Sequence, residues 1–245
     1  MTAYNETAVT LAASAARGTS GTGTAVDLGV CTMARLVLAC SAVSGTGSPT
    51  LTVTVQTSPD QLAWTTATAF TARTTVGTQE INVAGCSRYV RAIWTIAGTG
   101  PSFTFGVSGS AFVVYCSPTD LYGLAIPQRA LADITADTMA RAIKSASEDL
   151  DGRFNRRYTF PLVSWSTELT QHAAELAAFT CLTTRGTSLD GQDWDVLKDI
   201  RDSARSWAKG VGNKSIDPPG IVDSTATVDE AGPVMYTNTK RGWGT

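Results

Sequence analysis

The first half of the chain shows the alternation of apolar and polar residues that is typical of half-buried β-strands. In residues 50–55, TLTVTV, the apolar side chains are Leu51, Val53 and Val55, and threonines occupy the positions between them. A strand with one face in a core and the other in water requires this period of two. Comparable alternating or apolar segments lie at residues 34–43, 79–85, 88–96 and 102–109.

Short turn-type sequences, including SGTGSP, SPDQ and AGTGPS, separate these segments. Strands at this spacing, without helical stretches between them, predict an antiparallel β-sandwich over residues 25–116. Residues 10–24 are rich in Ala, Ser, Gly and Thr. We therefore interpret residues 1–24 as a flexible arm that precedes the sandwich.

Residues 117–216 change to the three- and four-residue spacing of amphipathic helices. Ser117 followed by Pro118 is a typical helix start, and Thr135 and Ser166 are further N-cap candidates. We predict four helices here, and therefore an α+β multidomain protein. The predicted apolar faces are Met139, Ile143, Ala146, Leu150 and Phe154 in the second helix, Leu169, Ala173, Leu176 and Thr180 in the third, and Trp194, Leu197, Ile200, Ala204, Trp207 and Val211 in the fourth.

Residues 217–245 lose this periodicity, and prolines at positions 218, 219 and 233 interrupt regular structure. A segment of this kind cannot bury enough surface to fold alone. It still carries apolar and basic residues that a purely solvating tail would not need. We predict an extended docking tail whose contact residues are Val234, Met235, Tyr236, Lys240, Arg241 and Trp243.

Charge is distributed unevenly along the chain. Residues 1–117 carry nine of the 40 charged residues, and the other 128 residues carry 31, which places a domain boundary near Cys116. The net charge is −2 and no long basic block occurs, which argues against a protein that mainly grips the DNA backbone. No apolar run reaches the ~18 residues of a membrane span, and no secretory signal is expected.

Candidate catalytic chemistry is sparse. His172 is the single histidine and falls within the third predicted helix, where we expect an ion pair with Glu168. The five cysteines form no CxxC pair, so reduced and mostly buried thiols are expected in place of a metal or redox site. We predict no catalytic residue, no metal, no cofactor and no enzymatic activity. Three acidic residues of the second helix are interpreted as its solvated face: Glu148, Asp149 and Asp151.

Three arginines, Arg153, Arg156 and Arg157, close the second predicted helix. Cations at a helix C-terminus interact favourably with the helix dipole, which gives the arginines an ordinary structural role. The alternative is a contact with an acidic partner surface or with passing DNA. The sequence leaves both interpretations open.

A series of motifs runs from Tyr115 to about Gly212: an opening Y-x-x-P-x-D-L, a later D-G-R-F-x-x-R-Y-x-x-P-L, an alanine-rich helix and a Trp-containing helix. This order resembles the head–tail connector family of Mu-like and related long-tailed phages, in its adaptor or head-completion class. The TKRGW segment at residues 239–243 is similar to the family's basic and aromatic end. The matching motif residues are Tyr115, Pro118, Asp120, Leu121, Asp151, Gly152, Arg153, Phe154, Arg157, Tyr158, Pro161 and Leu162.

The resemblance implies a structural virion protein of the viral neck that is assembled in the host cytoplasm. A homo-oligomeric ring, expected to be a dodecamer, would lie below the portal protein. The ring would join the capsid to the tail, and genomic DNA would pass through its channel without being read. The portal and a tail-terminator or stopper protein are the implied partners, and no membrane is implied.

The first half has a separate resemblance. QTSPDQLAWTT at residues 56–66 and SRYVRAIWTI at residues 87–96 resemble strings of discoidin-like, galactose-binding sandwiches, with Gln61 where that pattern usually has Gly. Such a module in a phage is either a plain structural unit or a glycan-binding one. Trp64 and Trp94 are therefore candidate glycan platforms or core residues. The alternative function is a carbohydrate-binding virion decoration protein that its helices oligomerise.

Overall fold

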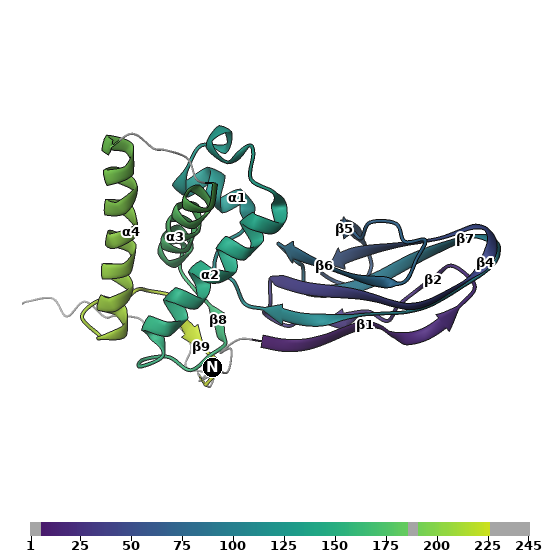
Figure 1. Cartoon of the computed structure of the whole chain (residues 1–245). Coiled ribbons are helices and arrows are strands. Elements are labelled where there is room, and N and C mark those ends of the chain that lie inside the picture. The colour runs from purple at the N-terminus through teal and green to yellow at the C-terminus, as the bar shows by residue number, and fades with distance from the viewer. Residues whose placement is uncertain (1–5, 186–190, 226–245) are drawn as a thin grey trace, which may run out of the picture.

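The structure is a computed structural model that describes residues 6–185 and 191–225 (Figure 1). An antiparallel β unit precedes a helical unit, as the α+β prediction requires. The β unit contains β1 (Glu6–Arg17), β2 (Gly21–Thr22), β3 (Val26–Asp27), β4 (Met33–Ser58), β5 (Thr65–Ala69), β6 (Gly77–Ala84) and β7 (Tyr89–Phe112). The helical unit contains α1 (Pro118–Asp120), the π-helical turn η1 (Leu121–Ala125), the 3-10 turn η2 (Gln128–Leu131), α2 (Ala136–Phe154), β8 (Leu162–Ser164), α3 (Thr167–Arg185), α4 (Gly191–Gly212) and β9 (Val222–Asp223).

The β unit is one continuous seven-stranded sheet that folds over on itself. The long strands β4 and β7 pair from end to end, and the strand order is β1-β7-β4-β5, with β2 and β3 also on β7 and β6 also on β4. Near the middle of both strands, Gly45 and Gly98 take positive φ values of 126° and 124°. Residues with a Cβ rarely adopt this conformation, so the glycines allow both strands to bend together at the end far from the helices (Figure 1).

The bend produces two layers with a shared core. The first half of β4 and the second half of β7, with β1 and β6, form the first layer. The second half of β4 and the first half of β7, with β2, β3 and β5, form the second layer. Trp94 of the second layer contacts Phe105 of the first at 5.6 Å between ring centroids. The predicted alternation in residues 50–55 is confirmed, because Leu51, Val53 and Val55 are fully buried.

The predicted flexible arm is wrong for the residues that the structure describes. Residues 6–17 form β1, which pairs with the second half of β7. Val9 and Leu11 supply the reason, since they alternate along the strand and are buried in the core. The Ala-, Ser- and Thr-rich composition hid this short alternation. Residues 1–5 lie outside the described part of the chain.

The predicted helix starts are confirmed. The Ser117 hydroxyl accepts from the Asp120 N–H at 3.3 Å, and the Asp120 carboxylate accepts from the Ser117 N–H at 2.7 Å, which is a complete capping box. The Thr135 hydroxyl accepts from the Thr138 N–H at 3.2 Å and caps α2. The short helix expected after Ser117 continues from α1 into the π-helical turn η1, whereas the turn η2 was not predicted.

Helices α2 and α3 pack against each other, and α4 lies along the outer side of this pair (Figure 1). The apolar face predicted for α4 is only partly buried. Its last turns bury Ala204, Trp207 and Val211, whereas Trp194 is half-buried and contacts Phe179 of α3 at 5.6 Å between ring centroids. Among the described helices, none combines the length and the apolar character that crossing a bilayer requires.

The two units share one hydrophobic core without a linker between them. The change from strand to helix occurs at residue 117, as predicted, but residues 113–116 before it are buried at 1–4% exposure. Asn82 Nδ2 of β6 donates to Asp137 Oδ1 of α2 at 2.6 Å. Lys144 Nζ of α2 lies 4.3 Å from the centre of the Phe112 ring. The first half of α2 therefore rests directly on the first layer of the sheet.

Phe154 at the end of α2 offers a test of this core. Its fully buried ring contacts Tyr158 at 6.1 Å and Trp207 at 6.0 Å between centroids. Phe154→Ala should lower the free energy of unfolding by about 3–5 kcal/mol, because a cavity remains between α2 and α4. Val163→Ala, at a side chain that is 50% exposed, is the control and should change it by less than about 0.5 kcal/mol. Chemical denaturation measures both, and equal effects would contradict this packing.

Candidate functional site

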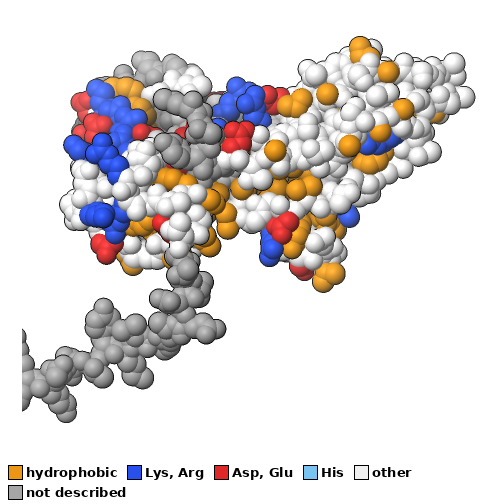
Figure 2. All heavy atoms as spheres, turned by 90° about the horizontal axis from the view of Figure 1, so that it is seen from below, with side chains coloured by type: hydrophobic (Ala, Val, Ile, Leu, Met, Phe, Trp, Pro, Cys, Tyr) orange, Lys and Arg blue, Asp and Glu red, His pale blue; other side chains and the backbone are white. Residues whose placement is uncertain are grey.

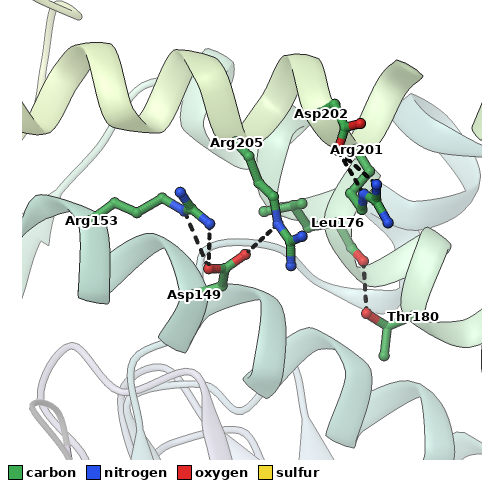
Figure 3. A network of polar contacts seen from close by, with 7 residues as sticks. All are labelled: Asp149, Arg153, Leu176, Thr180, Arg201, Asp202 and Arg205. Atoms are coloured by element: carbon green, nitrogen blue, oxygen red, sulfur yellow. Dashed lines mark hydrogen bonds and ion pairs between the residues drawn. The ribbon is translucent and has the colours of Figure 1, made fainter. Parts of the chain in front are cut away.

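The arginine cluster at the end of α2 is largely engaged within the chain. Asp149 Oδ1 accepts from Arg153 Nη2 at 2.9 Å, and Asp149 Oδ2 accepts from Arg205 Nε of α4 at 3.0 Å (Figure 3). One carboxylate thus joins arginines from two helices. The three side chains are 29–44% exposed, so solvent screens these pairs and each stabilises the fold only modestly. Asp149 therefore does not lie on a freely solvated face.

The contacts between the helices continue one turn earlier on α4. Arg201 pairs with Asp202 at 2.8 Å (Figure 3). Its guanidinium carbon lies 4.7 Å from the centre of the Phe179 ring of α3. Because Phe179 is also in contact with Trp194, the aromatic side chains of α3 and α4 stack beneath a cation. Polar and aromatic contacts together fix α4 against the α2–α3 pair.

Arg157 has a structural role that the sequence did not reveal. Its Nη1 donates to the carbonyl oxygens of Ile216 at 2.7 Å and Val211 at 3.3 Å, and its Nη2 pairs with the Asp217 carboxylate. The side chain is only 16% exposed. Arg157 therefore ties the end of α2 to the end of α4 and to the first residues after it.

Gly212 allows this close approach. A Cβ at this position would lie 2.2 Å from the carbonyl oxygen of Arg153, far inside van der Waals contact. The backbones of α2 and α4 therefore meet where α4 ends. A larger residue at position 212 would separate the two helix ends that Arg157 joins.

The beginning of the predicted docking tail folds onto the helical unit. Residues 222–223 form β9 and pair with β8, and the Asp223 carboxylate accepts from the Thr159 N–H at 2.9 Å. The Ser164 hydroxyl donates to the Gly220 carbonyl oxygen at 3.1 Å. The predicted contact residues Val234, Met235, Tyr236, Lys240, Arg241 and Trp243 lie outside the described residues.

Arg156 differs from its two neighbours. It is exposed and, within residues 6–185 and 191–225, makes no ion pair with another side chain. Of the three predicted contact arginines, Arg156 is thus the one that is not ion-paired with another described residue.

His172 faces α4 and not an open site. Its Nδ1 lies 2.9 Å from Glu175 Oε2, and its ring centre lies 4.5 Å from that of Trp207. The predicted partner Glu168 instead accepts from Trp207 Nε1 at 2.8 Å. The expected Glu168–His172 pair is therefore wrong, because Trp207 of α4 occupies that carboxylate.

A buried polar contact lies at the junction of the two units. The hydroxyl of Tyr115 hydrogen-bonds to Asp151 Oδ1, and the Tyr115 N–H donates to Ser147 Oγ at 3.1 Å. Asp151 is only 4% exposed, so its predicted place on a solvated face is wrong. The sequence motifs had singled out Tyr115 and Asp151 separately, and the structure brings them together.

An open pocket of about 630 Å³ lies beside this junction. Its walls include Val114, Cys116, Leu124 and Trp165, and its carboxylate, Asp120, is engaged in the capping box. Among the described residues, no group of three or more His, Cys, Asp or Glu side chains is arranged to hold a metal ion. The pocket therefore presents mainly apolar and hydroxyl surface.

The two candidate glycan platforms are both covered. The Trp64 ring lies under the Arg91 guanidinium, whose central carbon is 4.0 Å from the ring centre, and its indole N–H donates to the Gln61 carbonyl oxygen at 3.0 Å. Trp94 packs on Phe105 and under Arg17 at 4.8 Å. An arginine guanidinium thus lies over each of these half-buried rings.

The comparison with known proteins concerns the helical unit. Residues 115–230 match the family model described as Bacteriophage Mu, Gp36. The match covers just under half of the chain, begins at the buried Tyr115 and leaves the β unit outside it. No curated protein matches the chain. The match supports a structural protein of a Mu-like phage.

The Tyr115–Asp151 contact predicts a sizeable effect of removing one hydroxyl. Tyr115→Phe leaves a buried carboxylate without this donor and should lower the free energy of unfolding by about 1–3 kcal/mol. Tyr122→Phe is the matched control, because within the described ranges the hydroxyl of this half-buried tyrosine makes one hydrogen bond, a weak one to the Met139 sulfur at 3.6 Å. Thermal and urea unfolding measure both variants. A loss no larger than that of Tyr122→Phe would contradict the importance of the contact.

The cysteines predict a pH dependence. All are buried and free, and burial raises the pKa of the Cys181 thiol to about 11, that of Cys86 to about 12, and those of Cys31, Cys40 and Cys116 above their usual value. The native thiols should therefore react slowly with iodoacetamide at pH 8, and unfolding in urea should make them reactive, because the thiolate is the nucleophile. Rapid native labelling would contradict this.

The free energy of unfolding should also fall as the pH rises above about 8.5, since the thiols ionise there only in the unfolded chain.

Proposed function

We propose that this chain is a head–tail adaptor of the virion neck, which forms a ring below the portal, joins the capsid to the tail and lets DNA pass. The observation that carries the proposal is the coincidence of the match to the Mu family model with the helical unit. That unit has the order of motifs by which the chain resembles phage adaptors. The ring and its expected twelvefold symmetry are part of the proposal.

The engaged side chains suit such a scaffold. The Asp149 bridge and the Arg157 contacts join α2 to α4, and the Trp207–Glu168 hydrogen bond joins α4 to α3, as a scaffold subunit of a ring needs. Arg157 also sets the direction in which the chain leaves α4. The docking tail then begins after Thr225, from a fixed point on the helical unit.

The portal is the proposed partner of this tail. Val234, Met235 and Tyr236 supply a short apolar segment that suits addition to a sheet edge, and Trp243 beside two cations suits a pocket. Arg156 is the residue that we assign to an acidic partner surface or to the passing DNA. A stopper or tail-terminator protein would bind the opposite side of the ring.

Deletion of residues 226–245 tests the docking tail, because residues 217–225 are needed for the Arg157 contacts and β9. The truncated chain should keep its far-ultraviolet circular dichroism and melting temperature but fail to co-purify with the portal. A chain in which a Gly/Ser segment of equal length replaces residues 226–245 is the control for length and should fail in the same way. Normal portal binding by either variant would place docking on the helical surface instead.

Electron microscopy of the purified chain, alone and with the portal, tests the ring. Rings with a central channel that stack on the portal are the expected result. A chain that stays monomeric with the portal present would overturn the adaptor proposal.

A further inference from the structure

A small cavity of about 50 Å³ lies between α2, α3 and α4. An enclosed water needs roughly 10–15 Å³, so the cavity has room for a few waters or for one small ion. Its walls include Ser145 and Asp149 of α2, Phe179 of α3, and Arg201 and Arg205 of α4. The kind of ion that it suits depends on how the two arginines are engaged.

Arg201 is held in a fixed position at this cavity. Its guanidinium carbon lies 4.7 Å from the centre of the Phe179 ring, and its Nε donates to Asp202 Oδ1 at 2.8 Å. The side chain is 24% exposed, so the protein covers most of it. Within the described residues, Arg201 Nη1 has no hydrogen-bond acceptor, so this nitrogen can donate to a ligand.

Arg205 lies one helical turn after Arg201, on the same side of α4. Its Nε donates to Asp149 Oδ2 at 3.0 Å, and neither of its Nη atoms has an acceptor in the described part of the chain. Figure 3 shows both arginines reaching from α4 toward α2 and α3. Ser145 adds a hydroxyl that makes no hydrogen bond with another described residue. Three side chains with donors to spare therefore line one small space.

The cavity has an excess of positive charge. Arg153 and Arg205 share the Asp149 carboxylate, and Asp202 pairs with Arg201, so three arginines against two carboxylates leave one positive charge. An anion therefore fits the cavity better than a cation does. Arginine binds phosphate through charge-assisted hydrogen bonds from its fork of N–H groups. Because phosphate has oxygens in more than one plane, two guanidiniums one turn apart can reach it together, whereas a planar carboxylate matches a single fork.

Two lysines extend the basic row along α4. Lys198 precedes Arg201 by three residues and Lys209 follows Arg205 by four, so all four side chains lie on one side of the helix. At 1.5 Å per residue, the row is roughly 16 Å long. Lys209 is exposed and makes no ion pair with another described residue. Figure 2 shows Lys and Arg side chains gathered over the helical unit, with acidic ones between them. A ligand with several phosphates in a chain would contact more of this row than a single phosphate does.

We propose that this cavity binds a phosphate group, which accepts hydrogen bonds from Arg201 Nη1 and from the Nη atoms of Arg205. Two sources share this chemistry, free phosphate and the backbone of a nucleic acid, and the lysines of the row favour the nucleic acid. The net charge of −2 fits contact with few phosphates and not a long grip on a backbone. The proposal goes beyond the adaptor function, since it assigns a ligand to a site that needs neither the ring nor the portal.

Equilibrium dialysis of the full chain against radiolabelled inorganic phosphate, at constant ionic strength, tests the site. Binding should saturate near one phosphate per chain. Arg201→Lys and Arg205→Lys keep the charge but remove the fork of N–H donors, so each should weaken phosphate binding by about tenfold or more. Circular dichroism of each variant checks that the helices remain folded.

Arg141→Lys is the matched control. Arg141 also lies on a long helix and pairs with a carboxylate, that of Asp137 at 2.8 Å, but it is about two turns of α2 away from Asp149. Its substitution should leave phosphate binding unchanged. An absence of saturable binding by the unmodified chain would overturn the proposal. An equal loss in all three variants would also do so, because it reports a general effect of replacing arginine.

A short, fluorescein-labelled thymidine oligonucleotide distinguishes the two sources through its fluorescence anisotropy. If a nucleic-acid backbone is the ligand, the oligonucleotide should bind more tightly than phosphate, and phosphate should displace it. Lys209→Gln should then reduce the slope of the logarithm of the binding constant against the logarithm of the salt concentration by about 0.7. If free phosphate is the ligand, the oligonucleotide should bind no more tightly than phosphate, and Lys209→Gln should change neither affinity.

Oligonucleotide binding that Arg205→Lys leaves unchanged would overturn the assignment of a backbone phosphate to this cavity. These measurements contain no portal, so their failure leaves the tail-deletion and ring results untouched, and the reverse also holds.

Discussion

The buried contact between Tyr115 and Asp151 is the constraint on which the arrangement of the two units depends. Tyr115 lies between the end of β7 and the start of α1, and its contact with Asp151 joins this part of the chain to the last turn of α2. A buried carboxylate, here 4% exposed, lowers stability unless hydrogen-bond donors satisfy it. If the tyrosine moved away, this carboxylate would lose one of its donors. The ladder of β7 and the axis of α2 are therefore fixed relative to each other, and Asn82 and Lys144 extend the same contact surface.

The two units are stabilised by different means, and each choice has a consequence. The helical unit adds ion pairs to its apolar core, with Asp149 between Arg153 and Arg205, and partial exposure makes these pairs sensitive to salt. The β unit relies instead on burial within two layers of one sheet, and it carries few charges for salt to screen.

Periodicity and capping residues predicted most of the fold because they act locally. The alternation at Leu51, Val53 and Val55 and the caps at Ser117 and Thr135 depend on neighbours within a few residues. Two of the errors have a common physical cause, since they concern partners distant in sequence. Asp151 was placed on a solvated face because its helix phase could not reveal Tyr115, and Glu168 was paired with His172 because Trp207 was out of view. The strand β1 was missed because its composition resembles a linker, although Val9 and Leu11 alternate.

The arginine trio shows why the candidate site was harder to predict than the fold. Three arginines near a helix end look equivalent in sequence, yet Arg153 pairs with Asp149 of its own helix, Arg157 binds backbone carbonyls and Asp217, and Arg156 stays exposed. The close approach of α4 at Gly212 brings acceptors to Arg157, whereas the acceptor of Arg153 lies on α2 itself. Because α2 also carries Asp151, this helix connects the Arg157 contacts at the end of α4 with the Tyr115 contact that anchors the sheet. In the adaptor that we propose, a force applied through the tail would reach the β unit along α2.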